Sequence, residues 1–379
     1  MNSFEERLLV RGVNWLGDAV MTTPALLRLR EAQPRARLTL LTHAKLADLW
    51  LHHPSIDSVL TFESGEGPFA IGRRLREENF SVALVLPNSP RSALEVFLAR
   101  IPRRIGHARP WRNLLLTQRV ASRADEFRMR KLSRRAIHRR IDPASPAPSA
   151  APQRTHHVYQ YLHLAAALGA KPEPLPPLVV VTRQEVEAVR ARFGQSGADP
   201  PPRLFGLNAG AEYGPAKRWP RERFVAAAVE LQRRAKCDWW IFGGKTDEPL
   251  ARSIAAEVAA AGSGPPTSVR CLAGQTSLRE LCAALKACDL LLTNDSGPMH
   301  IAAAVGTPVV VPYGSTSPEL TAPGLPGDPR HRLLKAQVPC SPCFLRQCPI
   351  DFRCMNGLSS EMVVAAAMQV LGSREESVK

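Results

Sequence analysis

The sequence lacks the features of a membrane-spanning or exported protein. Its most apolar stretch, residues 297–312, is interrupted by His300 and Pro308, so it is too short and too mixed for a transmembrane helix. The first ten residues carry Glu5 and Glu6 where a signal peptide needs a basic start followed by an apolar run. We therefore expect a cytoplasmic protein.

Two short motifs are also missing. The G-x-G-x-x-G fingerprint, which places the pyrophosphate of a dinucleotide on a helix N-terminus, does not occur in the chain. Asp-x-Asp, a spacing that can hold a divalent cation, does not occur either. The sequence therefore gives no indication of a dinucleotide fold of that type or of a carboxylate-bound metal.

Acidic residues are scarce relative to basic ones, and the imbalance is local. The chain has 50 Lys and Arg against 34 Asp and Glu, and its net charge is +16. Between residues 100 and 140, fourteen Lys and Arg accompany only Asp125 and Glu126. Such a segment attracts nucleic acid, anionic lipid headgroups or a phosphorylated glycolipid. A solvated basic loop is the alternative, and charge alone does not choose among these.

The order of the expected elements indicates an α/β protein with two Rossmann-like lobes and a cleft between them. Strand-like runs alternate with helical patterns in both halves, which favours parallel sheets covered by helices. The expected strands are 7–13, 37–42, 58–62 and 81–86, then 203–208, 238–242, 268–272, 290–293 and 308–312. The expected helices include 68–78, 91–99, 221–235, 248–261 and 277–287.

Two proline-rich segments interrupt this alternation. Residues 141–152 extend the basic run into a loop of the first lobe, and residues 171–177 predict a stiff interdomain linker. We therefore divide the chain into an N-terminal domain (1–172) with a basic insertion (121–155), a C-terminal domain (173–358) and a last helix. This helix, 359–379, is expected to pack back on the N-terminal domain.

A loop with two glycines follows the first expected strand. It reads RGVNWLGD from Arg11 to Asp18, and ligands of open α/β sheets bind at such carboxyl ends of strands. Thr23 and Pro24 predict the N-cap and first residue of a helix, which places Asp18 near a helix N-terminus. Because an acid there interacts favourably with the helix dipole, a structural role is the alternative to a catalytic one.

Two loops in the second half have the composition of anion sites. The loop 208–220 combines small residues with Lys217, a point charge for a phosphate. In residues 293–304, Pro298 opens a helix whose free N–H groups and dipole would face a pyrophosphate, with His300 as a further donor. The structural alternatives are a flexible turn with an exposed lysine and a histidine packed under its loop.

Four of the eight cysteines are close together, at Cys340, Cys343, Cys348 and Cys354. The cytosol keeps thiols reduced, and a cluster that begins with C-x-x-C is typical of a structural zinc or iron–sulfur site. Reduced thiols that pack a small subdomain, and disulfides formed during handling, are the alternatives.

Taken together, the motifs resemble glycosyltransferase family 9, and within it most closely the heptosyltransferases II. The resemblance runs through nearly the whole chain and rests on VNWLGDAVMTTPAL, LPNSPRSAL, PRRIGHARPWRNLLLTQRV, HVYQYLHLAAALG, GAEYGPAKRWP, TNDSGPMHIAAAVGTPVVVPYGSTSPELTAP and the late CSPC, in this order. It implies a GT-B fold and an inverting transfer that requires no metal or other cofactor. The implied donor is ADP-heptose.

The resemblance also implies the partners and the place of action. The acceptor would be the first heptose of the lipopolysaccharide inner core, carried on an anionic lipid A–core glycolipid. The enzyme would work peripherally at the inner-membrane surface, on its cytoplasmic face, and would bind no nucleic acid.

Individual residues acquire roles in the same way. Asp18 would be the catalytic base. The donor site would comprise Gly210, Lys217, Glu248, Asp295, Ser296, Gly297 and His300, with Asp247 as the alternative to Glu248. The acceptor site would comprise Asn14, Trp15, Asn88, Arg91, Arg103 and Arg104.

Other functions stay open at this point. A basic nucleic-acid-binding protein would explain the net charge, although not the anion loops that follow strands. A GT-B sugar-nucleotide epimerase would need no acceptor. Heptosyltransferases I and III share the fold, although GAEYGPAKRWP and the cysteine cluster favour II. The chain departs from the family pattern in its long basic segment 124–155 and at Pro90 and Pro110.

The basic segment also has an apolar pattern. Residues 128–140 place Met129, Leu132, Ala136 and Ile137 among the cations. This pattern predicts a basic amphipathic helix on a membrane surface, close to an anionic glycolipid acceptor.

Overall fold

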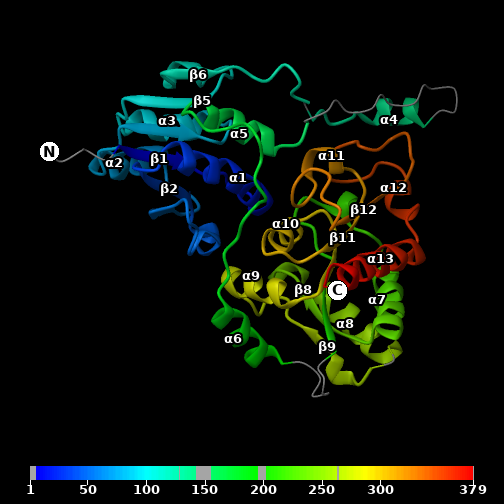
Figure 1. The fold of residues 1–379 in the computed structure, drawn as a ribbon. Helices are drawn as coiled ribbons and strands as arrows, with labels where there is room; N and C mark the ends of the chain where they lie inside the picture. The colour runs from blue at the N-terminus through cyan, green and yellow to red at the C-terminus, as the bar shows by residue number, and fades with distance from the viewer. Residues whose placement is uncertain (1–5, 128, 142–154, 195–201, 263, 379) are drawn as a thin grey trace. The chain divides into compact units, whose positions relative to one another are not determined.

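The computed structural model describes residues 6–127, 129–141, 155–194, 202–262 and 264–378. They form two compact units, which Figure 1 draws mainly in blue and cyan and mainly in green to red. The first holds the described residues within Met1–Glu126 and Pro152–Val180, and the second those within Phe127–Ala151 and Val181–Lys379. The chain thus changes unit shortly after the expected linker at 171–177.

The first unit is a parallel sheet with the strand order β3-β2-β1-β4-β5-β6. Its strands are β1 (Arg7–Arg11), β2 (Arg37–His43), β3 (Ser58–Phe62), β4 (Val82–Val85), β5 (Arg103–His107) and β6 (Gln118–Val120). Its helices are α1 (Leu16–Ala32), α2 (Pro68–Glu77), α3 (Pro90–Leu98) and α5 (Val158–Ala166), with the 3-10 turns η1 (Ala44–Trp50) and η2 (Asn113–Leu115). An apolar core joins α2 and α3 to one face of the sheet, and α1 packs against α5. The last two strands were not expected from the sequence.

The second unit repeats this plan with the order β12-β11-β10-β7-β8-β9, again parallel. Its strands are β7 (Arg203–Asn208), β8 (Cys237–Phe242), β9 (Val269–Cys271), β10 (Leu290–Thr293), β11 (Val309–Tyr313) and β12 (Arg332–Lys335). Its longer helices are α6 (Arg183–Phe193), α7 (Arg221–Ala235), α8 (Glu248–Ala261), α9 (Leu278–Ala287), α10 (Gly297–Ala304) and α13 (Ser360–Val378). The short elements are α4 (Arg134–Arg140), α11 (Pro318–Thr321), α12 (Arg353–Asn356), η3 (Pro215–Lys217), η4 (Lys245–Asp247) and η5 (Pro266–Ser268).

Two parallel sheets, each covered by helices, confirm the expected α/β fold class. Among the described residues, no helix combines the length and the apolar composition needed to cross a bilayer.

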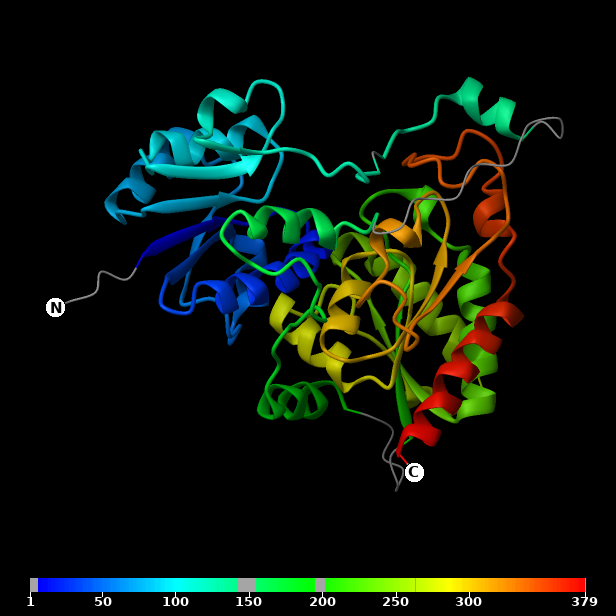
Figure 2. The ribbon, with the colours of Figure 1, turned by 45° about the horizontal axis from the view of Figure 1, so that its top comes forward.

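The last helix packs within the second unit. Val363, Ala367 and Val370 of α13 are buried in the same core as Phe224 and Leu231 of α7, and Figures 1 and 2 show α13, in red, beside α7. This differs from the expectation that residues 359–379 pack on the N-terminal domain. The reason is that the apolar side of the helix is used to complete the core of the second unit.

The first helix begins earlier than the sequence indicated. Trp15 is the N-cap of α1, and Pro24 lies inside the helix. Pro24 has no N–H to donate to the carbonyl of Val20, and the hydroxyl of Thr23 donates to that carbonyl instead, at 2.8 Å. The expectation of an N-cap at Thr23 was therefore wrong, and Asp18 lies in the first turn of the helix.

Within the basic insertion, the described residues from 127 to 141 belong to the second unit, whereas 121–126 and 155 belong to the first. Ile137 of α4 is 1% exposed and packs with Cys340 and Cys343. The backbone N–H of Leu132 donates to the carbonyl of Cys343 at 3.0 Å. Of the apolar residues expected to face a membrane, Ile137 is therefore buried, Leu132 and Ala136 are partly buried, and Met129 is 49% exposed. Arg128 lies outside the described residues.

A buried ion pair anchors the loop that follows β1. Arg11 and Glu95 are 2% and 0% exposed, and Arg11 Nε donates to Glu95 Oε2 at 2.8 Å. Arg11 also donates to the carbonyl of Gly12 and to Asn14 Oδ1, at 2.5 and 2.9 Å. Its guanidinium lies 4.4 Å from the ring centroid of Phe62. One side chain thus ties β1 and its loop to β3 and α3.

We expect Glu95→Gln to lower the free energy of unfolding of the first unit by about 3–5 kcal/mol, because Arg11 would lose its charged partner in a buried site. Urea unfolding followed by circular dichroism measures this. Glu31→Gln removes the carboxylate of the exposed pair Arg28–Glu31 and should cost less than about 1 kcal/mol. Equal losses in the two variants would contradict the anchoring role.

Candidate functional site

Each sheet has one point at which the strand order reverses, between β1 and β4 in the first unit and between β7 and β10 in the second. Connections leave these neighbouring strands in opposite directions, and the crevice at their carboxyl ends is where open α/β sheets bind ligands. The loops that the sequence singled out follow β1, β7 and β10. The fold therefore places all of them at the two reversal points.

The first unit has a pocket of about 270 Å³ at its reversal point. The loops after β1 and β4, the first turn of α1, the end of β5 and the helix α5 supply its walls. The lining residues are Val13, Asn14, Trp15, Asp18, Leu86, Pro87, Asn88, Ser89, His107, Gln160 and Tyr161. Four residues predicted from the sequence are thus brought together here: Asn14, Trp15, Asp18 and Asn88.

Asp18 is a half-buried carboxylate in the wall of this pocket. The hydroxyl of Tyr161, from α5, donates to Asp18 Oδ1 at 3.4 Å. Burial and the charge of Asp18 raise the pKa of Tyr161 well above its usual value. The phenol therefore stays protonated at neutral pH and can keep donating to the carboxylate.

The wall formed by the β4 loop is braced by Arg112. This buried side chain donates to the carbonyl of Pro87 at 2.7 Å and to Asn88 Oδ1 at 3.4 Å. Its guanidinium occupies space that only a glycine at position 106 leaves free, since a Cβ on Gly106 would lie 2.6 Å from Nη2. Burial, with the charge of Arg109, lowers the pKa of Arg112 to about 10, so it is still a cation at neutral pH.

His107, at the end of β5, also lines the pocket and is 4% exposed. Burial, with a smaller contribution from Arg109, lowers its pKa to about 4. The imidazole is therefore neutral at pH 7, when one of its ring nitrogens is an acceptor.

Three of the arginines expected at the acceptor site lie away from this pocket. Arg103 and Arg104 begin β5, at the opposite end of the sheet from the carboxyl ends of the strands. Arg103 donates to Gln118 Oε1 and Arg104 to the carbonyl of Leu115. Arg91, which is half-exposed, pairs with the buried carboxylate of Glu95 one turn along α3. The family resemblance assigned all three to the acceptor site, and a sequence does not show which end of a strand or which face of a helix carries a residue.

At the reversal point of the second unit, Lys217 and Asp295 form an ion pair. Their Nζ and Oδ2 atoms are 2.7 Å apart, and the side chains are 14% and 4% exposed. Thr316 also donates to Asp295 Oδ2, at 2.6 Å. Asp295 directly precedes Ser296, the N-cap of α10, so the lysine ammonium is held beside a helix N-terminus.

Two buried asparagines connect the loops around this pair. Asn208, which ends β7, donates to Thr293 Oγ1 and Ser296 Oγ at 3.2 and 3.1 Å. Asn294 donates to the carbonyl of Ala209 at 2.7 Å and accepts from the N–H of Trp219 at 3.0 Å. The loops after β7 and β10 are therefore fixed to each other by side-chain amides.

Gly210 lies against an acid, and that acid is Asp247. A Cβ on Gly210 would lie 2.5 Å from Asp247 Oδ2, and Asp247 also accepts from the N–H of Gly244 at 3.3 Å. Glu248, the residue favoured from the sequence, pairs instead with Arg252 along the surface of α8. His300 is 5% exposed within α10.

Several residues at these two points were missed from the sequence. Gln160 and Tyr161 interrupt the apolar segment of α5, and such polar positions in an apolar helix are a usable signal. Thr316 and Tyr213 gave no such signal. The ring centroid of Tyr213 lies 4.9 Å from Lys217 Nζ, and the hydroxyl of Thr316 donates to Asp295. Loops that are far apart in sequence therefore bring both residues to this ion pair.

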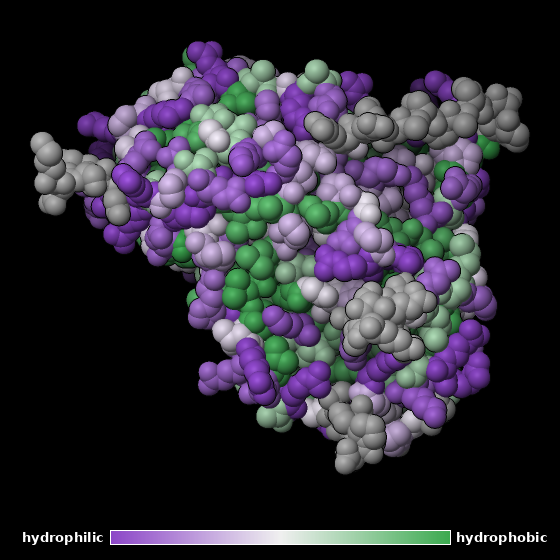
Figure 3. All heavy atoms as spheres, viewed as in Figure 1, coloured by the Kyte–Doolittle hydropathy of each residue, from purple (hydrophilic) through white to green (hydrophobic). Residues whose placement is uncertain are grey.

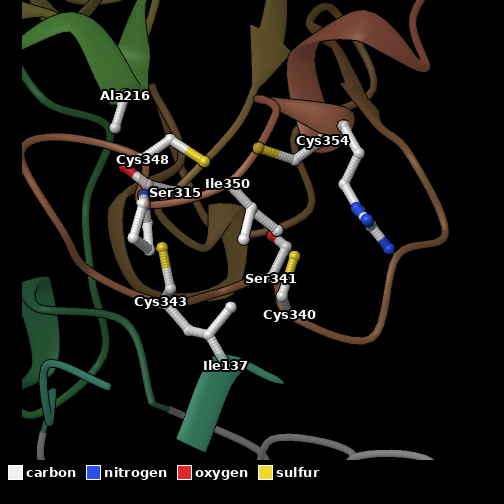
Figure 4. A pocket seen from close by; sticks show the side chains of 11 residues that line it. Ile137, Ala216, Ser315, Cys340, Ser341, Cys343, Cys348, Ile350 and Cys354 are labelled. Atoms are coloured by element: carbon white, nitrogen blue, oxygen red, sulfur yellow. The ribbon is translucent and has the colours of Figure 1, made fainter. Parts of the chain in front are cut away.

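The four clustered cysteines surround a small space closed by Ile137 (Figure 4). Burial raises the pKa of Cys340 and of Cys343, and that of Cys354 to about 12, which favours protonated thiols. Within the described residues, no group of three or more His, Cys, Asp or Glu side chains is arranged to hold a metal ion. The cluster predicted from the sequence is present, although its side chains do not form a ligand set.

Known proteins match this chain over most of its length. Residues 69–352 match the model of glycosyltransferase family 9 (heptosyltransferase). The chain is 32% identical to lipopolysaccharide heptosyltransferase 2 of Salmonella typhimurium over 331 residues, which cover 84% of this chain and 85% of that protein. Its fold is similar to that of Escherichia coli ADP-heptose lps heptosyltransferase II, with a TM-score of 0.75 and 27% identity over 97% and 99% of the two chains.

A solved family 9 glycosyltransferase of Veillonella parvula shares the fold as well, with a TM-score of 0.76 at 22% identity over 98% and 99% of the two chains. The resemblance found in the motifs and the GT-B fold that it implied are thereby confirmed. The chain belongs to glycosyltransferase family 9, the heptosyltransferases.

Proposed function

We propose that this chain transfers the heptosyl group of ADP-heptose to the first heptose of the lipopolysaccharide inner core, with inversion at the anomeric carbon. The observation that carries the proposal is the ammonium of Lys217 held beside the N-terminus of α10. An ammonium and a helix N-terminus together provide the positive charge that a pyrophosphate needs. The relatives named lipopolysaccharide heptosyltransferase 2 support the choice of sugar and acceptor.

Asp295 acts in this proposal by positioning Lys217. A lysine ammonium has three N–H donors, and Asp295 takes one of them. The others can be donated to phosphate oxygens of ADP. Ser296, Gly297 and the N-terminus of α10 add backbone donors, and the absence of a Cβ at Gly210 keeps Asp247 close to the loop after β7.

The reaction begins at Asp18. Its carboxylate removes the proton of the acceptor hydroxyl while that oxygen forms a bond to the anomeric carbon of heptose. The bond from this carbon to the phosphate oxygen breaks, and its electron pair leaves with ADP. Attack from the side opposite ADP inverts the configuration. Lys217 and the α10 N-terminus stabilise the charge that develops on ADP, so the reaction needs no metal.

The pocket of the first unit would hold the acceptor sugar. Asn14 and Asn88 offer amide groups, and the ring of Trp15, 48% exposed, offers an apolar platform for a sugar face. The acceptor is an anionic glycolipid, so the enzyme would act on the cytoplasmic face of the inner membrane.

We expect Asp18→Asn to lower the rate of transfer by about 10²–10⁴-fold, the usual contribution of a general base, with donor affinity unchanged. Quantifying ADP release with purified acceptor, and ADP-heptose binding by calorimetry, separates the two effects. Tyr161→Phe keeps the carboxylate of Asp18 and should lower the rate of transfer much less. An asparagine variant with full activity would exclude Asp18 as the base, and rapid turnover of donor without acceptor would contradict the transferase function itself.

Lys217→Ala should weaken ADP-heptose binding by about tenfold to a hundredfold, because a charge-assisted hydrogen bond contributes roughly 1.5–3 kcal/mol. EDTA should leave the wild-type rate unchanged. Lys171→Ala, which removes an exposed lysine of the linker, is the matched control. A strict requirement for magnesium or manganese, or unchanged binding by the alanine variant, would argue against this donor site. In Lys217→Ala the buried carboxylate of Asp295 loses its charged partner. Melting curves of both variants report whether this loss has unfolded the protein.

The C-x-x-C spacing alone would indicate about one zinc or one iron–sulfur cluster per chain, the usual complement of four thiolates. Because the described cysteine side chains form no ligand set, we expect neither metal in stoichiometric amount. Elemental analysis of protein purified without chelators tests this. Neither metal in stoichiometric amount would identify the cysteines as packing thiols, in agreement with their raised pKa values. The catalytic proposal does not depend on the result.

A further inference from the structure

Two large apolar side chains of the first unit are almost fully exposed. Trp111 and Leu114, in the connection between β5 and β6, are 88% and 89% exposed. They are three residues apart and bracket the start of the turn η2. Exposure of two large apolar groups within one short turn is unusual for a soluble surface and is typical of an interaction site.

The backbone conformation of Trp111 is unfavourable as well as its exposure. Its φ is 67°, in the left-handed region that bulky residues rarely adopt. For a residue with a Cβ this conformation is sterically unfavourable, whereas glycine adopts it freely. A tryptophan that is both strained and exposed contributes nothing visible to the folded unit, so a partner outside the chain accounts for it better.

The neighbouring surface is apolar and basic. Arg104 donates to the carbonyl of Leu115 in η2, and its guanidinium lies 5.4 Å from the ring of Phe97, which is 42% exposed on α3. Residues 68–119 contain ten arginines and three glutamates; Arg112 is buried, and the other nine arginines are partly or fully exposed. Figure 3 shows hydrophobic groups interspersed among hydrophilic ones over this part of the first unit.

We propose that Phe97, Trp111 and Leu114, with the surrounding arginines, form a docking surface for an anionic bilayer, and we call it the Trp111 surface. The tryptophan and leucine would enter the boundary between headgroups and acyl chains, where tryptophan is enriched in membrane proteins. The arginines would contact lipid phosphates. The proposal rests on the proposed function, because only a lipid-linked acceptor requires such a surface.

The Trp111 surface adjoins the acceptor pocket through the next residue in the chain. Arg112 donates to Pro87 and Asn88, and both residues line the pocket. Membrane contact and pocket wall are therefore one connected structure within the first unit. A glycolipid headgroup that leaves the bilayer beside Trp111 would reach the pocket without leaving this unit.

The cations of α4 are the competing candidate for membrane contact. Arg134, Arg135 and His138 are exposed, but Leu132 and Ile137 are packed on the cysteine cluster. Met129, 49% exposed, is the one exposed large apolar side chain in the described part of that segment, which therefore offers less apolar surface than Trp111 and Leu114. Charge alone gives an attraction that salt screens, whereas buried apolar area gives one that salt does not remove.

The test compares Trp111→Ser/Leu114→Ser with Arg134→Gln/Arg135→Gln. Sedimentation with vesicles of phosphatidylethanolamine and phosphatidylglycerol measures binding at low and high salt. We expect the first variant to bind at least about tenfold more weakly at both salt concentrations, and the second to be impaired only at low salt. Bromine-labelled phospholipid should quench tryptophan fluorescence in the wild type and in Trp15→Phe, and much less in the Trp111 variant.

An assay of transfer to a short soluble heptosyl acceptor distinguishes a failure of membrane docking from a failure of the transferase function. The Trp111 variant should keep its wild-type rate with that acceptor and show a raised KM for acceptor in vesicles. No transfer by the wild type would count against the proposed function alone. Vesicle binding and KM unchanged in the Trp111 variant would overturn the docking surface. A concentration-dependent dimer that the variant abolishes, seen by analytical ultracentrifugation, would assign the surface to a second copy instead.

Discussion

The geometry of the first unit depends on one buried ion pair. Arg11 ends β1 just where the polar loop toward Asp18 begins, and its guanidinium is satisfied by Glu95, Gly12 and Asn14. A charge placed in a core must be matched by groups in fixed positions, because no water can replace them. The loop is therefore held by contacts on its buried side, and its outer side is left free to form a pocket.

In the second unit, neutral side chains fix the loops at the reversal point. The amide NH2 of Asn208 and both ends of the Asn294 amide join the loops after β7 and β10, beside the ion pair of Lys217 and Asp295. Side-chain amides fix a loop without adding net charge to the site. At this site the buried carboxylate of Asp295 is paired with Lys217, and the amides add no further negative charge that would repel an anion.

The sequence was sufficient for the fold class, for most strands and for the loops at the carboxyl ends of β1, β7 and β10, since these follow from local pattern. It failed where tertiary contacts decide. Pro24 lies within a helix because the Thr23 hydroxyl takes over a backbone bond. Arg103 donates to a side chain of the neighbouring strand, and Ile137 is buried by cysteines from the other end of the chain. No local periodicity records such partners.

The packing of Ile137 on Cys340 and Cys343 also bears on biosynthesis. These partners are separated by more than half of the chain, and the segment around Ile137 leaves the ribosome long before the cysteines do. During that interval a strongly basic stretch with apolar side chains has no folded surface to cover it. Until the second unit is complete, Ile137 has no folded surface to cover it, and the nascent chain depends on chaperones more than the finished protein does.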